Sequence, residues 1–194
     1  MTTRVDGGQI KDGDITEAKL QTLINPTVQV SNNAFNIGVL GFKLAVNDGL
    51  TVFNLVDGVV DEFHDNTGVD TSESSNATYD ASADTFSNST TSMTLISDTF
   101  TANTTPSTAR IVLFAELPDG TSDFTISVTR DNSTFNNITL TDEGYQAGSS
   151  GIKIFSGSTS LTGSSSPQVQ VRWKIVGSSL TGTNKIHGVS LQWK

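Results

Sequence analysis

The sequence predicts a mainly β protein: an antiparallel, jelly-roll-like β-sandwich preceded by an extended N-terminal arm with one short helix. Two observations support this prediction. Residues 123–144 alternate apolar and polar side chains on both sides of an Asp/Asn/Ser turn, which is typical of a β-hairpin with one buried face. From residue 93 onward, short runs of this kind recur with turns every ~8–12 positions, the spacing expected of a sandwich or barrel.

The N-terminal arm comprises residues 1–26. Asp14 and Thr16 are candidate N-caps, and Asn25-Pro26 should end a short helix. So short a helix is not stable alone in water, so we expect the arm to order by docking on a partner; a frayed terminus is the alternative. Its apolar contacts would be Ile10, Ile15, Leu20, Leu23 and Ile24.

Residues 27–92 form a second part with two different characters. Residues 27–60 alternate well and predict two to four strands. Residues 57–92 are acidic and rich in Ser, Asn and Thr, which predicts a long surface loop with one or two irregular edge strands. The third part, 93–194, is the C-terminal sandwich. A single domain over 27–194 is the alternative division.

The strongest strand signal of the C-terminal part is the apolar run at residues 111–114, which predicts a central strand buried on both faces. Trp173 and Trp193 lie in alternating runs and are expected in the core or at a subunit interface. His187 is expected to be a strand-end side chain that makes one hydrogen bond.

The composition excludes several classes of protein. With 11 basic and 20 acidic residues and a net charge of -9, the chain is a poor partner for nucleic acid or an anionic membrane. It has no cysteine, and no apolar run approaches the ~18 residues of a membrane span. The polar N-terminus lacks the apolar core of a signal peptide, so we expect use without Sec export.

No catalytic constellation stands out, so we expect no enzyme activity and no cofactor. Serines occur without the Gly-x-Ser-x-Gly elbow, and no pair of carboxylates is marked for acid–base chemistry. His64 lies among Asp61, Glu62 and Asp65, but the spacing matches no known chelate, and a solvated acidic loop is the expected state. Calcium binding by the acidic loop 57–84 stays open.

The turn at residues 129–135 resembles an Asp-box hairpin that lacks its Gly and is one residue short. This resemblance implies that Asp131 binds turn amides and that Phe135 fills the core. Tyr145, in the loop after the hairpin, is the best candidate for an exposed aromatic that contacts a glycan.

Several segments resemble virion proteins of tailed phages, of the tail fibre, head fibre and decoration type. In the C-terminal part these are FTISVTRDNSTFNNITLTDEG, GIKIFSGSTSLTG, QVQVRWKIVG and KIHGVSLQWK; near the N-terminus it is GGQIKDGDITEAKLQTL. The resemblance implies a virion location after assembly in the host cytoplasm, a homotrimer, and an arm bound to a major capsid, tail or baseplate protein.

The sequence therefore favours a virion surface protein that displays a β-sandwich as capsid decoration or head fibre. A tail fibre is the nearest alternative. A carbohydrate-binding module for host attachment, with a host surface glycan as partner, is the alternative from another class.

Overall fold

The computed structural model describes residues 37–38, 52–55 and 57–194. The chain divides into two units, Met1–Ile37 and Gly38–Lys194, and every described strand belongs to the second. The predicted arm over residues 1–26, with its helix and docking residues, and the strands expected before residue 52 lie outside the described residues. No helix within the described ranges is long and apolar enough to cross a membrane.

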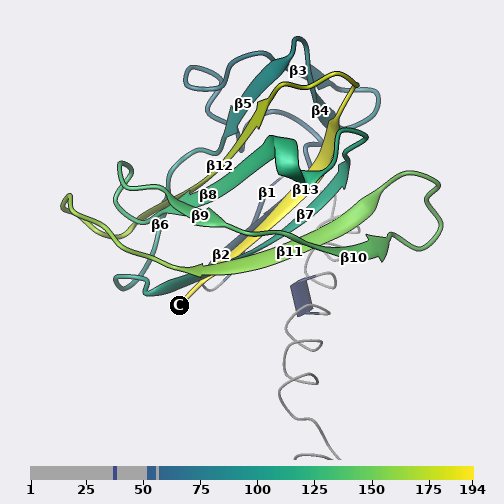
Figure 1. The fold of residues 1–194 in the computed structure, drawn as a ribbon. Coiled ribbons are helices and arrows are strands. Elements are labelled where there is room, and N and C mark those ends of the chain that lie inside the picture. Colours follow the sequence, from purple (N-terminus) through teal and green to yellow (C-terminus); the bar gives the residue numbers. More distant parts are fainter. Residues whose placement is uncertain (1–36, 39–51, 56) are drawn as a thin grey trace, which may run out of the picture. The chain divides into compact units, whose positions relative to one another are not determined.

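The second unit contains an antiparallel sheet of eight strands (Figure 1). Six follow the order β1-β2-β13-β7-β11-β10, and β3 joins through β4, which pairs with β13. Their bounds are β1 Val52–Leu55, β2 Gly58–Asp61, β3 Ala77–Asp80, β4 Thr85–Asn88, β7 Thr108–Glu116, β10 Thr141–Tyr145, β11 Lys153–Ser160 and β13 Lys185–Trp193.

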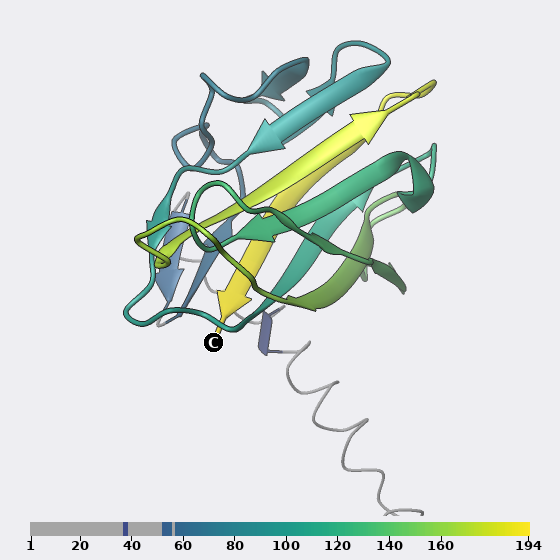
Figure 2. The same ribbon diagram turned by 60° about the vertical axis from the view of Figure 1, so that its left-hand side comes forward.

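A second antiparallel sheet packs against the first, as the turned view in Figure 2 shows. Its order is β5-β12-β8-β9, and the short β6 pairs with the other end of β12. A 3-10 turn at Thr121–Asp123 (η2) precedes β8. The bounds are β5 Ser92–Ile96, β6 Phe100–Thr101, β8 Phe124–Thr129, β9 Asn136–Ile138 and β12 Gln170–Ser178. The predicted mainly β, antiparallel sandwich is therefore confirmed.

The core lies between the two sheets and follows the alternation of the strands. Trp173 on β12 is fully buried, and Trp193 on β13 is 9% exposed, so both tryptophans are core residues as expected. On β7, residues 111–114 are all buried, which confirms the predicted central strand. Ile111 and Leu113 face the second sheet, whereas Val112 and Phe114 form a separate apolar cluster with Val60 on the outer face.

The predicted hairpin is present, and its second run divides between the sheets. β8 and β9 pair with Ile126 opposite Ile138. After β9 the chain crosses over, and β10 pairs with β11 in the larger sheet. Gly157 on β11 lies close beneath this crossover, because a Cβ there would meet Ile138 Cγ2 and the carbonyl oxygen of Thr139. The close approach of backbone to backbone requires glycine at this position.

The acidic segment 57–92 takes a larger part in the fold than its composition predicts. β2 lies between β1 and β13, so it is an interior strand of the large sheet. Phe63 is fully buried, in edge-to-face contact with Phe86 at 5.0 Å between ring centroids. Its φ of 59° is uncommon for a bulky residue, and burial among aromatic rings holds it there. Glu62, expected in a solvated loop, is also buried.

Candidate functional site

Asp131 fixes the turn between β8 and β9, as its Asp-box resemblance implies. Its Oδ1 accepts the backbone amides of Ser133 at 3.1 Å and Thr134 at 2.7 Å. Its Oδ2 accepts the backbone amides of Ser164 at 2.7 Å and Ser165 at 3.0 Å, in the loop between β11 and β12. One buried carboxylate thus joins two loops at the same end of the sandwich.

These contacts fix the ionisation of Asp131. Burial alone would raise the pKa of this carboxyl, but the backbone amides of Ser165, Thr134, Ser133 and Ser164 outweigh burial and hold the pKa far below its usual range. A carboxylate that stays ionised and saturated with hydrogen bonds is a poor general acid or base. Asp131 is therefore a structural residue.

The other half of the Asp-box prediction is wrong. Phe135 is only half-buried and does not belong to the core between the sheets. Lys174 Nζ of strand β12 lies 3.7 Å from its ring centroid, in a cation–π contact. The shortened turn leaves the aromatic side chain beside the sheet surface, where a lysine covers it.

A second carboxylate, Asp119, joins the loop after β7 to the loop before β13 in the same manner. Asp119 accepts the hydroxyl of Thr181 and the backbone amides of Thr181 and Gly182, and Asn184 Nδ2 donates to it at 2.7 Å. The side-chain hydrogen bonds from Thr181 and Asn184 and the amide of Gly182 lower the pKa of Asp119 to about 2. This carboxylate, too, is committed to structure.

A buried arginine anchors the acidic loop to the smaller sheet. Arg172 on β12 donates through Nη2 to Asp70 Oδ2 and through Nη1 to Glu73 Oε2, both at 2.9 Å. Its Nε donates to the carbonyl oxygen of Ser97 at 2.7 Å, and Nη1 also reaches Asn132 Oδ1 at 3.0 Å. The Arg172 side chain is only 3% exposed. Two carboxylates of the acidic loop therefore neutralise a buried positive charge.

The predicted cluster around His64 forms only in part. His64 Nδ1 lies 2.9 Å from Asp84 Oδ2, and Nε2 lies 3.2 Å from Glu62 Oε2. Asp65 instead accepts the amide and hydroxyl of Thr67. In the part of the chain that the structure describes, no three His, Asp or Glu side chains are grouped so as to hold a metal ion. Asp84, twenty residues from His64, was not among the predicted members.

The pKa of Asp61, which lies beside this cluster, is shifted in the opposite direction to the pKa of Asp131. Its side chain is fully buried, and Oδ1 accepts the backbone amide of Phe63 at 3.0 Å. Burial, with lesser contributions from Asp65, Glu62 and Asp98, raises the pKa of Asp61 to about 7. No opening to solvent reaches this carboxyl, which is 0% exposed, so a substrate has no access to it.

Of two further predicted residues, His187 makes the expected contact, whereas Tyr145 is exposed as expected but lies in a strand and not in a loop. His187 on β13 contacts Glu116 Oε1 through Nε2 at 2.8 Å, which is the single hydrogen bond predicted for it. Tyr145, at the end of β10, is 64% exposed, with Lys153 Nζ 5.2 Å from its ring centroid. Its glycan role stays a prediction.

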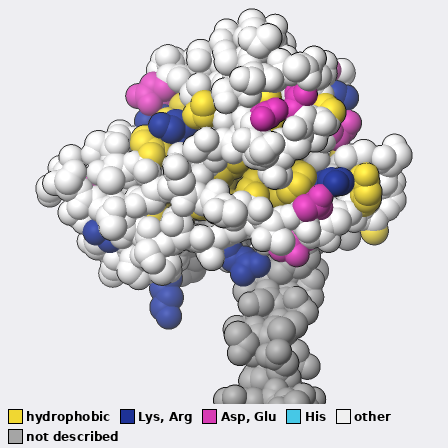
Figure 3. Space-filling model, in the orientation of Figure 1, with side chains coloured by type: hydrophobic (Ala, Val, Ile, Leu, Met, Phe, Trp, Pro, Cys, Tyr) yellow, Lys and Arg dark blue, Asp and Glu magenta, His cyan; other side chains and the backbone are white. Residues whose placement is uncertain are grey.

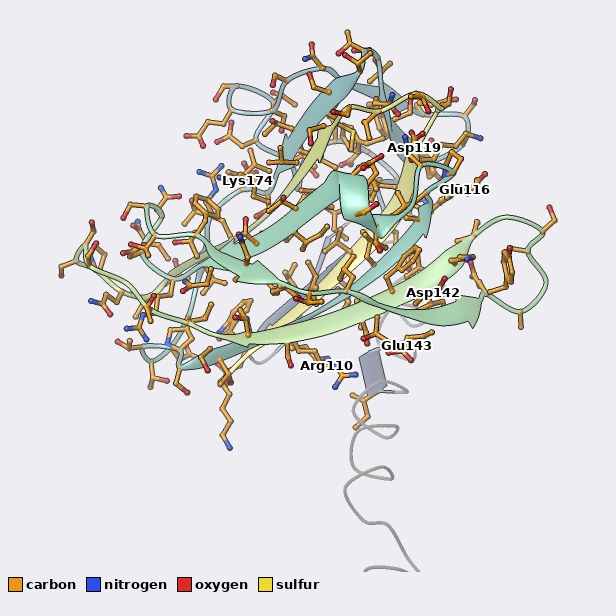
Figure 4. The ribbon with its side chains drawn as sticks, in the orientation of Figure 1. Arg110, Glu116, Asp119, Asp142, Glu143 and Lys174 are labelled. Atoms are coloured by element: carbon orange, nitrogen blue, oxygen red, sulfur yellow. The ribbon has the colours of Figure 1, made fainter. Side chains whose placement is uncertain are left out.

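A groove with a volume of about 590 Å³ lies on the outer face of the large sheet. The register aligns Ser158, Arg110 and Gln192 in one row across β11, β7 and β13. Figure 4 shows Arg110 on the side of this sheet away from Lys174, where Glu143 also lies. The lining residues are Thr108, Ala109, Arg110, Ser158, Thr159, Ser160, Gln192, Trp193 and Lys194.

Sequence reasoning did not identify this groove. Its polar residues come from three strands whose order in the sheet, β11-β7-β13, differs from their order in the chain. Polar positions on an alternating strand are expected at any solvated face, so the pattern gives no signal of a site. Most of the face that Figure 3 shows is backbone or uncharged polar side chain.

Comparison with known proteins adds little to this geometry. No protein-family model matches the chain, and no curated protein matches it. Among solved structures, the enzymatically active domain of tailspike protein 4 from bacteriophage CBA120 is similar with a TM-score of 0.35 and 13% identity. The match covers 57% of this chain and 15% of the tailspike chain, and it is too weak to assign a fold or a function.

Proposed function

We propose that the protein is a non-enzymatic structural protein displayed on the surface of a tailed-phage particle. Residues 1–26 attach it to another virion protein, and the β-sandwich faces outward. The sequence segments that resemble phage fibre and decoration proteins support this proposal. One structural observation carries it: the buried and hydrogen-bonded charges of the described sandwich fix its loops.

Three charged side chains illustrate that observation. Asp131 joins the β8–β9 turn to the β11–β12 loop, Asp119 joins the loop after β7 to the loop before β13, and Arg172 anchors the acidic loop. In an enzyme, such groups would be set near neutral pKa and open to substrate. Here the lowered pKa values of Asp131 and Asp119 reflect hydrogen bonds that hold loops in place, which suits a display domain.

Capsid decoration or a head fibre fits the chain better than a tail fibre. The described residues form one sandwich without a long helical or β-helical shaft to carry it away from the particle. We infer a homotrimer from the resemblance alone. Sedimentation velocity of the purified protein tests it, and a single monomeric species would contradict it.

Deletion of residues 1–26 tests the attachment. The truncated protein should no longer bind particles that lack it, while its circular dichroism retains the β spectrum of the full chain. Replacing Leu20 and Leu23 together by Asp should have the same effect with fewer changes. Tyr145→Ala, at an exposed position of the sandwich, is the matched control and should bind normally. Normal binding by the truncated protein would contradict the proposal.

A carbohydrate-binding module for host attachment is the second candidate, favoured by the 64% exposure of Tyr145. An exposed aromatic ring on a rigid strand is a stacking platform for a sugar. In this case Tyr145→Ala should lose binding on a glycan array on which the unchanged protein binds. Equal binding by both proteins would remove Tyr145 from the site.

A further inference from the structure

We propose that the groove on the outer face of the large sheet binds a carboxylate-bearing saccharide, with Arg110 as the anion-binding group. This site goes beyond the attachment function of residues 1–26. The groove also lies on the other face of the sheet from Tyr145. Tyr145 pairs with Lys153, which pairs with Ala115, and Ala115 faces the core. Arg110 instead alternates with the core residues Ala109 and Ile111 and faces outward.

The register builds the site as two parallel rows. Ser158, Arg110 and Gln192 are directly paired across three strands, so their side chains leave the sheet on the same face. Two positions along, Ser160 pairs with Thr108, and Thr108 exchanges two backbone hydrogen bonds with Lys194, each 3.0 Å long. With strands ~4.8 Å apart and residues ~3.3 Å apart along a strand, the patch measures roughly 10 Å by 7 Å.

Arg110 is the unusual member of this patch. It is half-buried, and its Nε is buried without a hydrogen-bond partner. It forms no ion pair with any residue in the described ranges, although the protein has a net charge of -9. Glu143, on the same face, is bonded through Oε1 to Ser156 Oγ at 2.6 Å. Arg110 therefore has a buried Nε without an acceptor and no ion pair among the described residues, and beside a groove it can donate to an external acceptor.

The chemistry of the patch selects the class of ligand. Arg110 presents a planar fork of donors that matches a carboxylate, and Lys194 adds a second positive charge. The surrounding hydroxyl and amide side chains can exchange hydrogen bonds with the hydroxyls of a sugar. No carboxylate side chain lines the groove. The dimensions of the patch suit one or two sugar rings, and the sheet holds the six side chains in fixed register.

Other anionic partners fit less well. A protein partner would be expected to meet exposed aromatic or aliphatic anchors, whereas the exposed members of these rows are polar. A nucleic acid needs an extended basic surface, which a chain of net charge -9 with two cations in this patch does not provide.

Binding of trigalacturonic acid to the full-length protein tests the site. Titration followed by amide NMR shifts should perturb residues of β7, β11 and β13 around Arg110. Arg110→Gln should weaken binding about tenfold or more, and Arg110→Lys should weaken it less, because lysine keeps the charge without the fork. Lys174→Gln, which removes one charge from the other sheet, is the matched control and should bind as the unchanged protein does. Maltotriose, which has no carboxylate, should bind at least tenfold more weakly.

Several outcomes would overturn the proposal. These are no binding of trigalacturonic acid, equal binding by Arg110→Gln and the unchanged protein, equal binding of maltotriose, or shifts centred on Tyr145. Inorganic phosphate or a poly-glutamate peptide that binds as tightly as the sugar would show an anion site without saccharide selectivity. Equal unfolding midpoints of the Arg110 variants and the unchanged protein separate loss of binding from loss of fold. Because the assay needs no particle, its failure leaves the attachment proposal standing.

Discussion

The Oδ2 oxygen of Asp131 accepts the backbone amide of Ser164 at 2.7 Å, across 33 positions of sequence. Asp131→Asn should therefore destabilise the protein by about 3 kcal/mol, because an amide group keeps one acceptor oxygen and turns a donor toward backbone N–H groups. Chemical denaturation at pH 7 measures the loss. Asp123→Asn removes a carboxylate without a hydrogen-bond partner among the described residues, and it should change stability by less than ~0.5 kcal/mol.

The pH dependence of the same variant gives an independent readout. Because the folded pKa of Asp131 lies below its unfolded value, its carboxylate stabilises the fold above pH ~4, and this contribution is lost as the pH falls below that value. Asp131→Asn should thus lose less stability than the unchanged protein between pH 5 and pH 2. If both proteins lose stability equally as the pH falls, folding does not lower the pKa of Asp131.

Asp61 should shift stability in the opposite direction. Its folded pKa of about 7 lies above the unfolded value, so its contribution is complete below pH ~4 and is lost as the pH rises toward 7. Asp61→Asn, which cannot ionise, should remove this loss and be more stable than the unchanged protein at pH 8, on the order of 1–3 kcal/mol. Urea denaturation at pH 5 and pH 8 measures both. A variant less stable than the unchanged protein at pH 8 would contradict the burial of an ionisable Asp61.

Arg172→Lys should loosen the acidic loop while keeping the charge. Lysine cannot reach Asp70, Glu73 and the carbonyl oxygen of Ser97 at once, so buried acceptors lose their donors. We expect a cost of about 2 kcal/mol, moderated because Glu73 is half-exposed. Limited proteolysis should then cut within residues 66–76. Lys185→Arg, at a surface pair with Glu116, is the control and should leave the cleavage pattern unchanged.

Gly157→Ala tests the crossover between the sheets. A methyl group there would overlap Ile138 Cγ2 and the Thr139 carbonyl, so β9 or β11 must shift, at a cost of about 1–3 kcal/mol. Gly148→Ala is a control at a site with open space around it, although its positive φ adds a smaller backbone penalty. Thermal unfolding of both variants should rank Gly157→Ala as the less stable. The reverse order would mean that β11 does not pass so close to the crossover.

Local pattern was enough to predict the strands but not their partners. The alternation on either side of Asp131 predicted β8 and β9, and the apolar run at 111–114 predicted a central strand, because both signals are contained in a few residues. The crossover after Ile138 was not predicted, since alternation continues through it while the strand changes sheet.

The candidate site was harder to predict because its contacts are long-range. The resemblance to an Asp-box predicts that Asp131 binds the amides of its own turn. Its hydrogen bond to Ser164 depends instead on how two distant loops meet. Arg172 gives no sequence sign of its burial, and composition hid the buried Phe63 inside an acidic segment. Arg110 gains its neighbours Ser158 and Gln192 only from the strand register. Phe135 was misplaced because a turn one residue short does not return the ring to the core.

Imaging of intact particles labelled for this protein tests the proposed function most directly. Gold-labelled antibody against the sandwich, viewed by electron microscopy, should decorate the head of a tailed particle, and particles given only the protein without residues 1–26 should carry no label. Label on the tail alone would show that the protein is a tail fibre and not a capsid decoration protein. Absence of label from purified particles that assemble in cells making the full-length protein would contradict a virion surface protein.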